Sequence, residues 1–234
     1  MIGILTEKPS AAKNFATALN AKSVAKGIYG GNYNSEDFYI VHSVGHIFEF
    51  VPPENMVDPS RADVYKKWAL DRLPWNESDF SWKRQLQADK KDVFKTIQSV
   101  LKGCDEIVIA TDNDPSGEGD LLAWEILLAG GFKPVKWSRM YFEDESEKSL
   151  QKAFVARKPL SGVDGSREYA KGYYRARWDF LSMQFTRVAT LVGDGRSVLR
   201  EGRLKSAMVL MCGDALKAVS EYKKIPFYQN RFKD

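Results

Sequence analysis

The fold is decided by the stretch EIVIATDNDPSGEGDLLAWEIL, residues 106–127. A short apolar run comes first, a loop with two glycines and a proline follows, and a second apolar segment closes the stretch. This order predicts a buried strand, a turn and a helix. The loop carries four carboxylates within nine residues, namely Asp112, Asp114, Glu118 and Asp120.

So much negative charge at the end of a buried strand calls for a physical reason. Carboxylates this close repel one another, and each raises the pKa of its neighbours unless a cation lies among them. Hard oxygen ligands suit Mg²⁺, which usually keeps several waters and bridges to phosphate. We therefore predict a magnesium site in this loop. The alternative is a solvated loop that caps the next helix, because Asp and Gly are common turn residues.

The rest of residues 1–158 alternates between expected strands and expected helices. Short apolar strands that alternate with helices predict an α/β fold, with a mainly parallel sheet covered by helices on both faces. Besides 106–111, strands are expected at 2–5, once or twice within 23–50, and at 133–142. Helices are expected at 11–20, 64–70, 89–103, 121–131 and 145–159, the last beginning with acidic residues.

The pattern changes from about residue 166, where two long helices are expected at 173–191 and 204–222. We therefore predict two domains, an α/β domain at 1–158 and a partial, mainly α-helical domain at 159–234. The segment FYQNRF, residues 227–232, predicts the start of a strand. A single terminal strand needs a partner, so this segment favours a chain that is part of a longer protein.

Composition and charge narrow the function classes. The chain has 234 residues, 44% of them apolar, and a net charge of +4. Residues 1–150 hold 18 Lys and Arg against 23 Asp and Glu, a net of −5, whereas residues 151–234 hold 17 against 8, a net of +9. A basic segment beside an acidic site fits a polyanion partner, although a solvated basic face is the alternative.

No targeting or membrane segment is expected. No apolar run reaches the ~18 residues of a spanning helix, and Glu7 and Lys8 interrupt the first apolar stretch, unlike a secretory signal. We expect a cytoplasmic protein with no membrane partner. Cys104 and Cys212 lack a metal-like spacing and are expected to be reduced thiols.

The acidic loop has an expected neighbour from far away in the chain. In open parallel sheets, ligands bind at the carboxyl ends of the strands. Glu7 follows the first expected strand and Asp112 follows the strand at 106–111. Both side chains are therefore predicted to face the same crevice, with Glu118 near the start of the next helix.

Several segments resemble type IA DNA topoisomerases, particularly the topoisomerase III branch. The segments TEKPSAAKNFATAL, SVGHIFEF, LPW and ATDNDPSGEGDLLAWEIL are similar to the N-terminal Toprim domain of that family. The segments RARWDFLSMQFTRVATL and EGRLKSAMVLMCGDALKAVSEYKKIPFY are similar to the start of the helical domain that follows it. The resemblance covers nearly the whole chain in the expected order. It implies a bacterial isomerase that cleaves and rejoins single-stranded DNA with Mg²⁺ through a phosphotyrosine link, without a small-molecule cofactor.

The resemblance also implies roles for acidic and basic residues. Glu7 is expected to assist proton transfer, and Lys8 to contact the scissile phosphate. Asp112, Asp114 and Glu118 match the metal cluster of the family. The loop is two residues longer than the family's DxDxE pattern, so either Glu118 or Asp120 takes the third metal position, and the following glycine favours Glu118. The DNA-binding candidates are Arg175, Arg187, Arg203 and Lys205, and His46, Asp120 and Asp179 are further site candidates.

One element of the family's chemistry is missing from this sequence. None of the ten tyrosines lies in a recognisable copy of the nucleophile motif, which belongs to a later domain in the family. Phosphoryl transfer needs a nucleophile in line with the leaving oxygen as well as metal and positive charge. We expect an incomplete fragment that does not relax supercoiled DNA by itself. Two other functions stay open, a stand-alone Toprim nuclease and a non-catalytic nucleic-acid-binding accessory protein.

Overall fold

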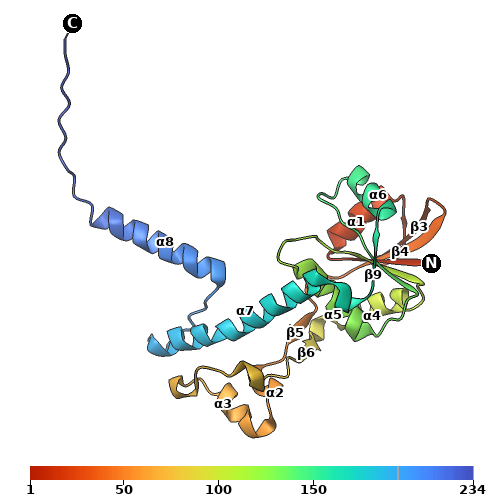
Figure 1. Cartoon of the computed structure of the whole chain (residues 1–234), viewed down its shortest axis with the longest axis horizontal. Helices are drawn as coiled ribbons and strands as arrows, with labels where there is room; N and C mark the ends of the chain where they lie inside the picture. Colours follow the sequence, from red (N-terminus) through yellow and green to blue (C-terminus); the bar gives the residue numbers. More distant parts are fainter. Residues whose placement is uncertain (194, 234) are drawn as a thin grey trace. The chain divides into compact units, whose positions relative to one another are not determined.

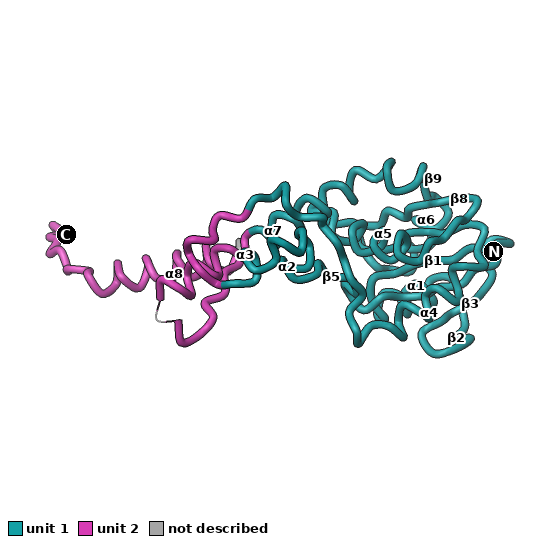
Figure 2. The backbone as a smooth tube through the Cα atoms, turned by 90° about the horizontal axis from the view of Figure 1, so that it is seen from below, with its two compact units in different colours: residues 1–67, 76–181 teal, residues 68–75, 182–234 magenta. Residues whose placement is uncertain are grey.

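A computed structural model describes residues 1–193 and 195–233, apart from the side chain of Arg203. The chain divides into two compact units (Figure 2). The first unit comprises residues 1–67 and 76–181. The second comprises residues 68–75 and the segment from residue 182 onward.

A seven-stranded sheet organises the first unit, with the strand order β2-β3-β4-β1-β7-β8-β9. The four inner strands run parallel to one another, and the pairings β2–β3, β3–β4 and β8–β9 are antiparallel. The predicted mainly parallel α/β fold is thereby confirmed. The inner strands are β4 (Glu36–His42), β1 (Ile2–Thr6), β7 (Glu106–Ala110) and β8 (Lys136–Arg139), and the outer ones are β2 (Lys22–Ala25), β3 (Ile28–Tyr33) and β9 (Lys158–Leu160).

Helices cover both faces of this sheet. Every residue of β1 and β7 is buried, as expected for strands with apolar contacts on both sides. Successive side chains of a strand point to opposite faces, so Ile4 packs with one helix pair and Leu5 with the other. One face carries α1 (Pro9–Ala18) and α6 (Glu147–Val155), and the other carries α4 (Lys91–Leu101) and α5 (Glu118–Gly130) (Figure 1).

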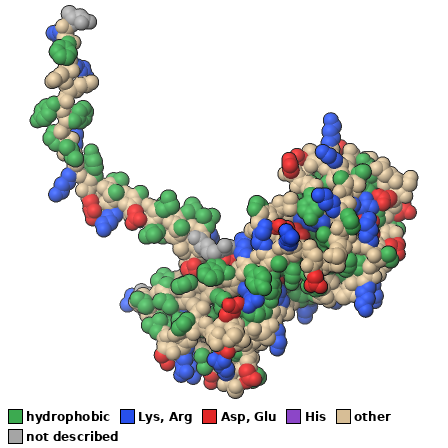
Figure 3. Space-filling model, viewed as in Figure 1, with side chains coloured by type: hydrophobic (Ala, Val, Ile, Leu, Met, Phe, Trp, Pro, Cys, Tyr) green, Lys and Arg blue, Asp and Glu red, His purple; other side chains and the backbone are tan. Residues whose placement is uncertain are grey.

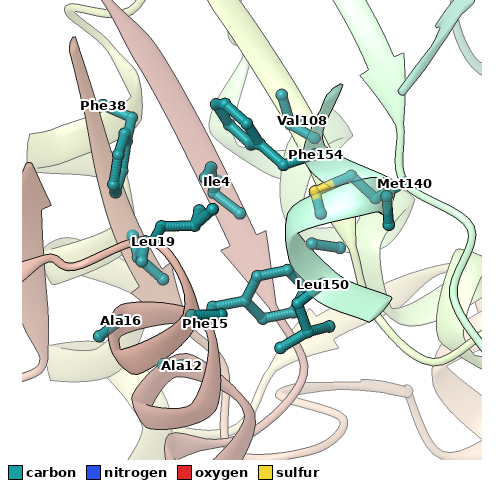
Figure 4. Close-up of a cluster of buried hydrophobic side chains, with 14 of the residues drawn as sticks. Ile4, Ala12, Phe15, Ala16, Leu19, Phe38, Val108, Met140, Leu150 and Phe154 are labelled. Carbon is teal, nitrogen blue, oxygen red and sulfur yellow. The ribbon is translucent and has the colours of Figure 1, made fainter. Parts of the chain in front are cut away.

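The core between the sheet and the first helix pair is aromatic at its centre. Figure 4 shows Phe15 of α1, with Phe154 and Leu150 of α6, directed toward the sheet residues Ile4 and Phe38. All five side chains have at most 1% of their surface exposed. Apolar burial on this scale stabilises by about 1.5–3 kcal/mol for each large side chain.

The region of residues 23–50 contains more strands than predicted. Instead of one or two, it forms β2, β3, β4 and the short β5 (Phe48–Phe50), which pairs with β6 (Arg84–Leu86). Tight turns separate the first three strands: Gly27 has φ +76°, and Asn34 and Ser35 have φ 52° and 65°. Positive φ at consecutive residues is typical of two-residue hairpin turns, and this signal was missed in the sequence.

Two further predictions need correction. The helix expected at 64–70 is α3 (Ala62–Lys66), preceded by the four-residue α2 (Pro53–Met56). The strand expected at 227–232 is wrong, because residues 223–233 adopt no regular structure. A strand is stable only when a partner satisfies its backbone hydrogen bonds, and this segment has none among the described residues.

Two long helices follow the α/β part, as predicted. They are α7 (Arg167–Val192) and α8 (Arg203–Ser220). The apolar side chains of α8, including Leu204, Met208 and Val219, are more than half exposed. Figure 3 shows hydrophobic side chains at the surface along this C-terminal segment.

A buried ionic cluster links the amino ends of two inner strands. The Arg157 guanidinium donates to the carboxylate of Glu106 at 2.9 and 3.1 Å and to that of Glu36 at 2.6 and 3.1 Å. Burial by itself would raise the pKa of Glu106. The hydrogen bonds and the charge of Arg157, with a further contribution from Lys136, outweigh burial and lower that pKa to about 2. The ionised carboxylate is therefore the form that the fold favours.

We predict that Glu106→Gln destabilises the protein by about 3 kcal/mol at pH 7. Because the folded-state pKa is depressed, this contribution is fully present above pH 4.5 and is lost as the pH falls toward about 2. Urea unfolding of both proteins at pH 7, 4 and 2.5 measures it. Glu36→Gln is the control, since its side chain is 41% exposed and its loss should cost less than about 1 kcal/mol. A cost for Glu106→Gln that does not change with pH would contradict the assignment.

Candidate metal and nucleic-acid site

The carboxyl ends of β1 and β7 bring two distant acids together. The strands are parallel neighbours with Thr6 opposite Ala110, so Glu7 and Asp112 emerge at the same edge of the sheet. Burial raises the pKa of Glu7, and the nearby Asp112 charge raises it further, although a hydrogen bond from the Asp112 backbone acts in the opposite direction. The two carboxylates are therefore close enough to repel each other, as the sequence predicted.

Lys8 supplies a positive charge at this edge. Its Nζ lies 3.4 Å from Asp112 Oδ2 and 3.9 Å from Glu145 Oε1. Partial burial lowers the pKa of Lys8, but the charges of Asp112 and Glu145 outweigh this and raise it. Glu145 was missed as a site residue, because the sequence assigned it to the acidic start of a helix.

Asp114 caps its own loop. Its Oδ1 accepts hydrogen bonds from the backbone and hydroxyl of Ser116, and its Oδ2 accepts one from the Gly119 backbone at 3.0 Å. Burial raises the pKa of Asp114, but these hydrogen bonds lower it overall. A side chain at Gly119 would lie 2.1 Å from the Asp112 carbonyl oxygen, so the turn requires glycine there. The contacts of Asp114 are therefore those of the alternative interpretation, in which the loop caps the next helix.

A buried arginine holds the backbone of the acidic loop. Arg139 is fully buried and donates to Asp120 Oδ2 from Nε at 3.2 Å and from Nη2 at 2.9 Å. The same guanidinium donates to the carbonyl oxygens of Thr111 at 2.7 Å and Asp112 at 3.1 Å. Asp120 is 5% exposed, and its carboxylate forms a buried ion pair with Arg139. Arg139 is the last residue of β8, whose sequence KWSR is largely polar, so no pattern in the sequence marked it.

Glu118 faces a second group of predicted residues. Its Oε2 lies 2.7 Å from Arg175 Nη1, and its Oε1 lies 3.4 Å from His46 Nε2. Arg175 Nε is also 3.9 Å from Asp179. These four side chains line a cavity of about 250 Å³ that also includes Phe50. The structure therefore brings together four of the residues that the sequence singled out.

A buried carboxylate behind this cavity was not predicted. Glu125, on α5, has a side chain that is 6% exposed and pairs with Arg84. Its Oε2 lies 3.6 Å from His46 Nδ1. The nearby Glu125 carboxylate raises the pKa of His46, and the charge of Glu118 adds to this effect against desolvation. Glu125 reads as an ordinary helix residue in sequence, so no pattern marked it.

The carboxylates as placed fit a cation only in part. Within the residues that the structure describes, no three His, Cys, Asp or Glu side chains converge closely enough to hold a metal ion. The Asp114 carboxylate accepts hydrogen bonds from its own loop, and the Glu118 carboxylate is paired with Arg175. The adjacent pair Glu7 and Asp112 does fit Mg²⁺, which proteins commonly bind through one or two carboxylates with water and phosphate completing the shell.

The remaining DNA-binding candidates belong to the second unit. Arg187 is 6% exposed, and its guanidinium lies 4.6 Å from the Trp75 ring centre and 5.3 Å from that of Trp68. As placed, it faces two indole rings instead of solvent. Lys205 is exposed on α8. Arg203 lies outside the described side chains, so its contacts stay a prediction.

Comparison with known proteins gives the family. The model of the Toprim domain family matches residues 3–143, which is more than half of the chain, and the chain belongs to that family. Over 182 residues it is 34% identical to DNA topoisomerase 1 of Alkalihalophilus pseudofirmus, covering 76% of this chain and 23% of that protein. Over 228 residues it is 28% identical to DNA topoisomerase 3 of Staphylococcus epidermidis, covering 96% and 30%.

These matches confirm the resemblance to type IA DNA topoisomerases that the sequence motifs indicated. A further relative, DNA topoisomerase 3 of Bacillus anthracis, is 27% identical over 229 residues, which cover 96% of this chain and 29% of that protein. The matched part of the chain therefore spans between 23% and 30% of the length of these relatives. No helix within the described residues has the length and apolar character needed to cross a membrane.

We predict that Asp120→Asn destabilises the fold by about 3 kcal/mol, because it leaves the buried Arg139 charge without its carboxylate. Amide exchange at Thr111 and Asp112 should accelerate, since Arg139 also fixes their carbonyl groups. Asp112→Asn is the matched control: its side chain is 42% exposed, and its loss should cost less than about 1 kcal/mol. Urea unfolding and hydrogen exchange measure both effects. Equal costs for the two variants would show that the Arg139–Asp120 pair does not hold the loop.

Proposed function

We propose that this chain is part of a type IA DNA topoisomerase similar to topoisomerase III, and that the edge formed by Glu7, Lys8 and Asp112 binds Mg²⁺ beside a DNA phosphate. The observation that carries the proposal is the adjacency of Glu7 and Asp112, with the Lys8 ammonium 3.4 Å from Asp112. Two carboxylates and one ammonium group, from residues 7, 8 and 112 of the Toprim domain, suit phosphate chemistry. The site would act in the bacterial cytoplasm.

Each residue at this edge has a distinct part in the proposed chemistry. Mg²⁺, when bound, would neutralise the carboxylates and the phosphate oxygens. Lys8 would contact the scissile phosphate with a charge that does not depend on the metal. Glu7, whose repulsion from Asp112 the cation would relieve, would be ionised beside the cation and would accept a proton from the attacking hydroxyl group. Arg139 would keep the Asp112 backbone in place through its buried hydrogen bonds.

The nucleophile is proposed to come from outside this arrangement. Among the described residues, no tyrosine hydroxyl contacts Glu7, Lys8 or Asp112. A phosphoryl transfer needs an attacking oxygen in line with the leaving one, so a tyrosine of a further domain would complete the site. Of the two candidates for a third metal ligand, we favour Glu118. Asp120 is buried against Arg139, whereas the Glu118 side chain is half exposed.

Single-stranded DNA is the proposed partner. Arg175 lines the cavity beside Glu118, and Lys205 is exposed in the basic second half of the chain. The Arg175 guanidinium already bonds Ser116 and Glu118, so a phosphate would have to compete with one carboxylate. A cation bound near Glu118 would draw that carboxylate away from Arg175 and leave the guanidinium free for a phosphate. Metal binding would therefore favour DNA binding.

We predict that the chain binds single-stranded oligonucleotides with an affinity that falls as salt rises, and that Arg175→Gln lowers the slope of log K against log salt by about 0.7, one phosphate contact. Fluorescence anisotropy at several NaCl concentrations measures the slope. Lys22→Gln is the control, because Lys22 is an exposed cation on the outer strand β2. An unchanged slope in Arg175→Gln would show that Arg175 does not contact a DNA phosphate.

Incubation of the same chain with single-stranded DNA and Mg²⁺ separates the proposed function from its rivals. Binding without strand cleavage is the expected result, because the nucleophile is proposed to lie elsewhere. Metal-dependent hydrolysis that Asp112→Asn abolishes would favour a stand-alone Toprim nuclease. Cleavage that survives Asp112→Asn would contradict the metal assignment altogether.

A further inference from the structure

The Lys8 ammonium lies between two carboxylates that belong to different loops. Asp112 follows β7, and Glu145 lies in the loop between β8 and α6. Their oxygens are 3.4 and 3.9 Å from Lys8 Nζ. Both distances are within ion-pair range, so a small rotation of the flexible lysine stem transfers the charge from one carboxylate to the other.

Glu145 is the better fixed of the two partners. Asn14 of α1 donates from Nδ2 to Glu145 Oε2 at 2.5 Å, while the other oxygen, Oε1, is the one that faces Lys8. The Glu145 side chain is 27% exposed, compared with 42% for Asp112. Glu145 is therefore oriented before Lys8 approaches, by a neutral donor that leaves the carboxylate charge intact.

Lys8 and a divalent cation compete for the same carboxylate. The ammonium lies against Asp112 Oδ2, and a cation held by Glu7 and Asp112 would draw on the same negative charge. Two positive charges this close repel, so binding of the cation requires Lys8 to withdraw from Asp112. An ammonium that leaves one carboxylate at this half-buried edge is stabilised if it reaches another.

We propose that Glu145 is a positioning residue that receives the Lys8 ammonium when a divalent cation occupies Asp112, and so keeps Lys8 beside the phosphate site. This inference rests on the proposed Mg²⁺ site at Glu7 and Asp112. Without Glu145, Lys8 stays on Asp112 and competes with the cation. With Glu145, both positive charges are held at one edge, each by its own carboxylate.

Mg²⁺ titration of the whole chain, followed through the amide chemical shift of Asp112, tests the exchange. Glu145→Gln should weaken Mg²⁺ binding by about two- to fivefold, the range for a partly exposed ion pair. Asn14→Ala should shift affinity in the same direction without any change of charge, because Glu145 loses its fixed orientation. Glu143→Gln is the matched control: it removes the same charge from the same loop at an exposed residue, and it should have a smaller effect.

A Lys8→Met background makes the test specific. In that background no ammonium competes for Asp112, so Glu145→Gln should weaken Mg²⁺ binding no more than Glu143→Gln does. A full Glu145→Gln effect in Lys8→Met, or equal effects of Glu145→Gln and Glu143→Gln in the native background, would show a general charge effect and overturn the inference. A wild-type chain whose shifts at Asp112 do not respond to Mg²⁺ would instead overturn the proposed metal site, and the inference with it.

Discussion

Strands β1 and β7 run parallel as direct neighbours at the centre of the sheet, and this pairing is the constraint on which the site depends. Because both strands are buried on both faces, a shift of register by one residue would exchange side chains between the two cores and disrupt the packing of both. The register therefore fixes Glu7 beside Asp112 as firmly as the hydrophobic cores fix the strands. The repulsion between these acids is the cost that a bound cation would relieve.

Local hydrogen bonds refine what the register sets. Arg139 holds the loop carbonyls from inside the fold, and Asp114 ties the loop to the start of α5. The backbone at the sheet edge is thus rigid, whereas the outer charges of Lys8, Glu118 and Arg175 are ion-paired and partly exposed. A rigid backbone with exchangeable side-chain partners suits a site that alternates between cation, phosphate and internal ion pairs.

Sequence patterns predicted the buried strands, the main helices and the meeting of Glu7 with Asp112, because strand period and the carboxyl-edge rule depend on local residues and topology. They did not predict Glu145, Arg139 or Glu125, whose importance comes from contacts made across the fold. Nor did they show that Asp114 turns into its own loop, or that Arg187 packs on two tryptophans. Side-chain direction in loops and on long helices is decided by tertiary neighbours, which a single sequence does not display.

The central claim is that a divalent cation binds at the carboxyl ends of β1 and β7. Mn²⁺, which accepts the same oxygen ligands as Mg²⁺, broadens the NMR signals of nearby amides and so locates the ion directly. The account predicts that substoichiometric Mn²⁺ broadens the amides of Glu7, Lys8 and Asp112 first, and that excess Mg²⁺ restores them. Broadening that begins instead around Glu36 and Glu106, which lie at the amino ends of β4 and β7, would contradict it.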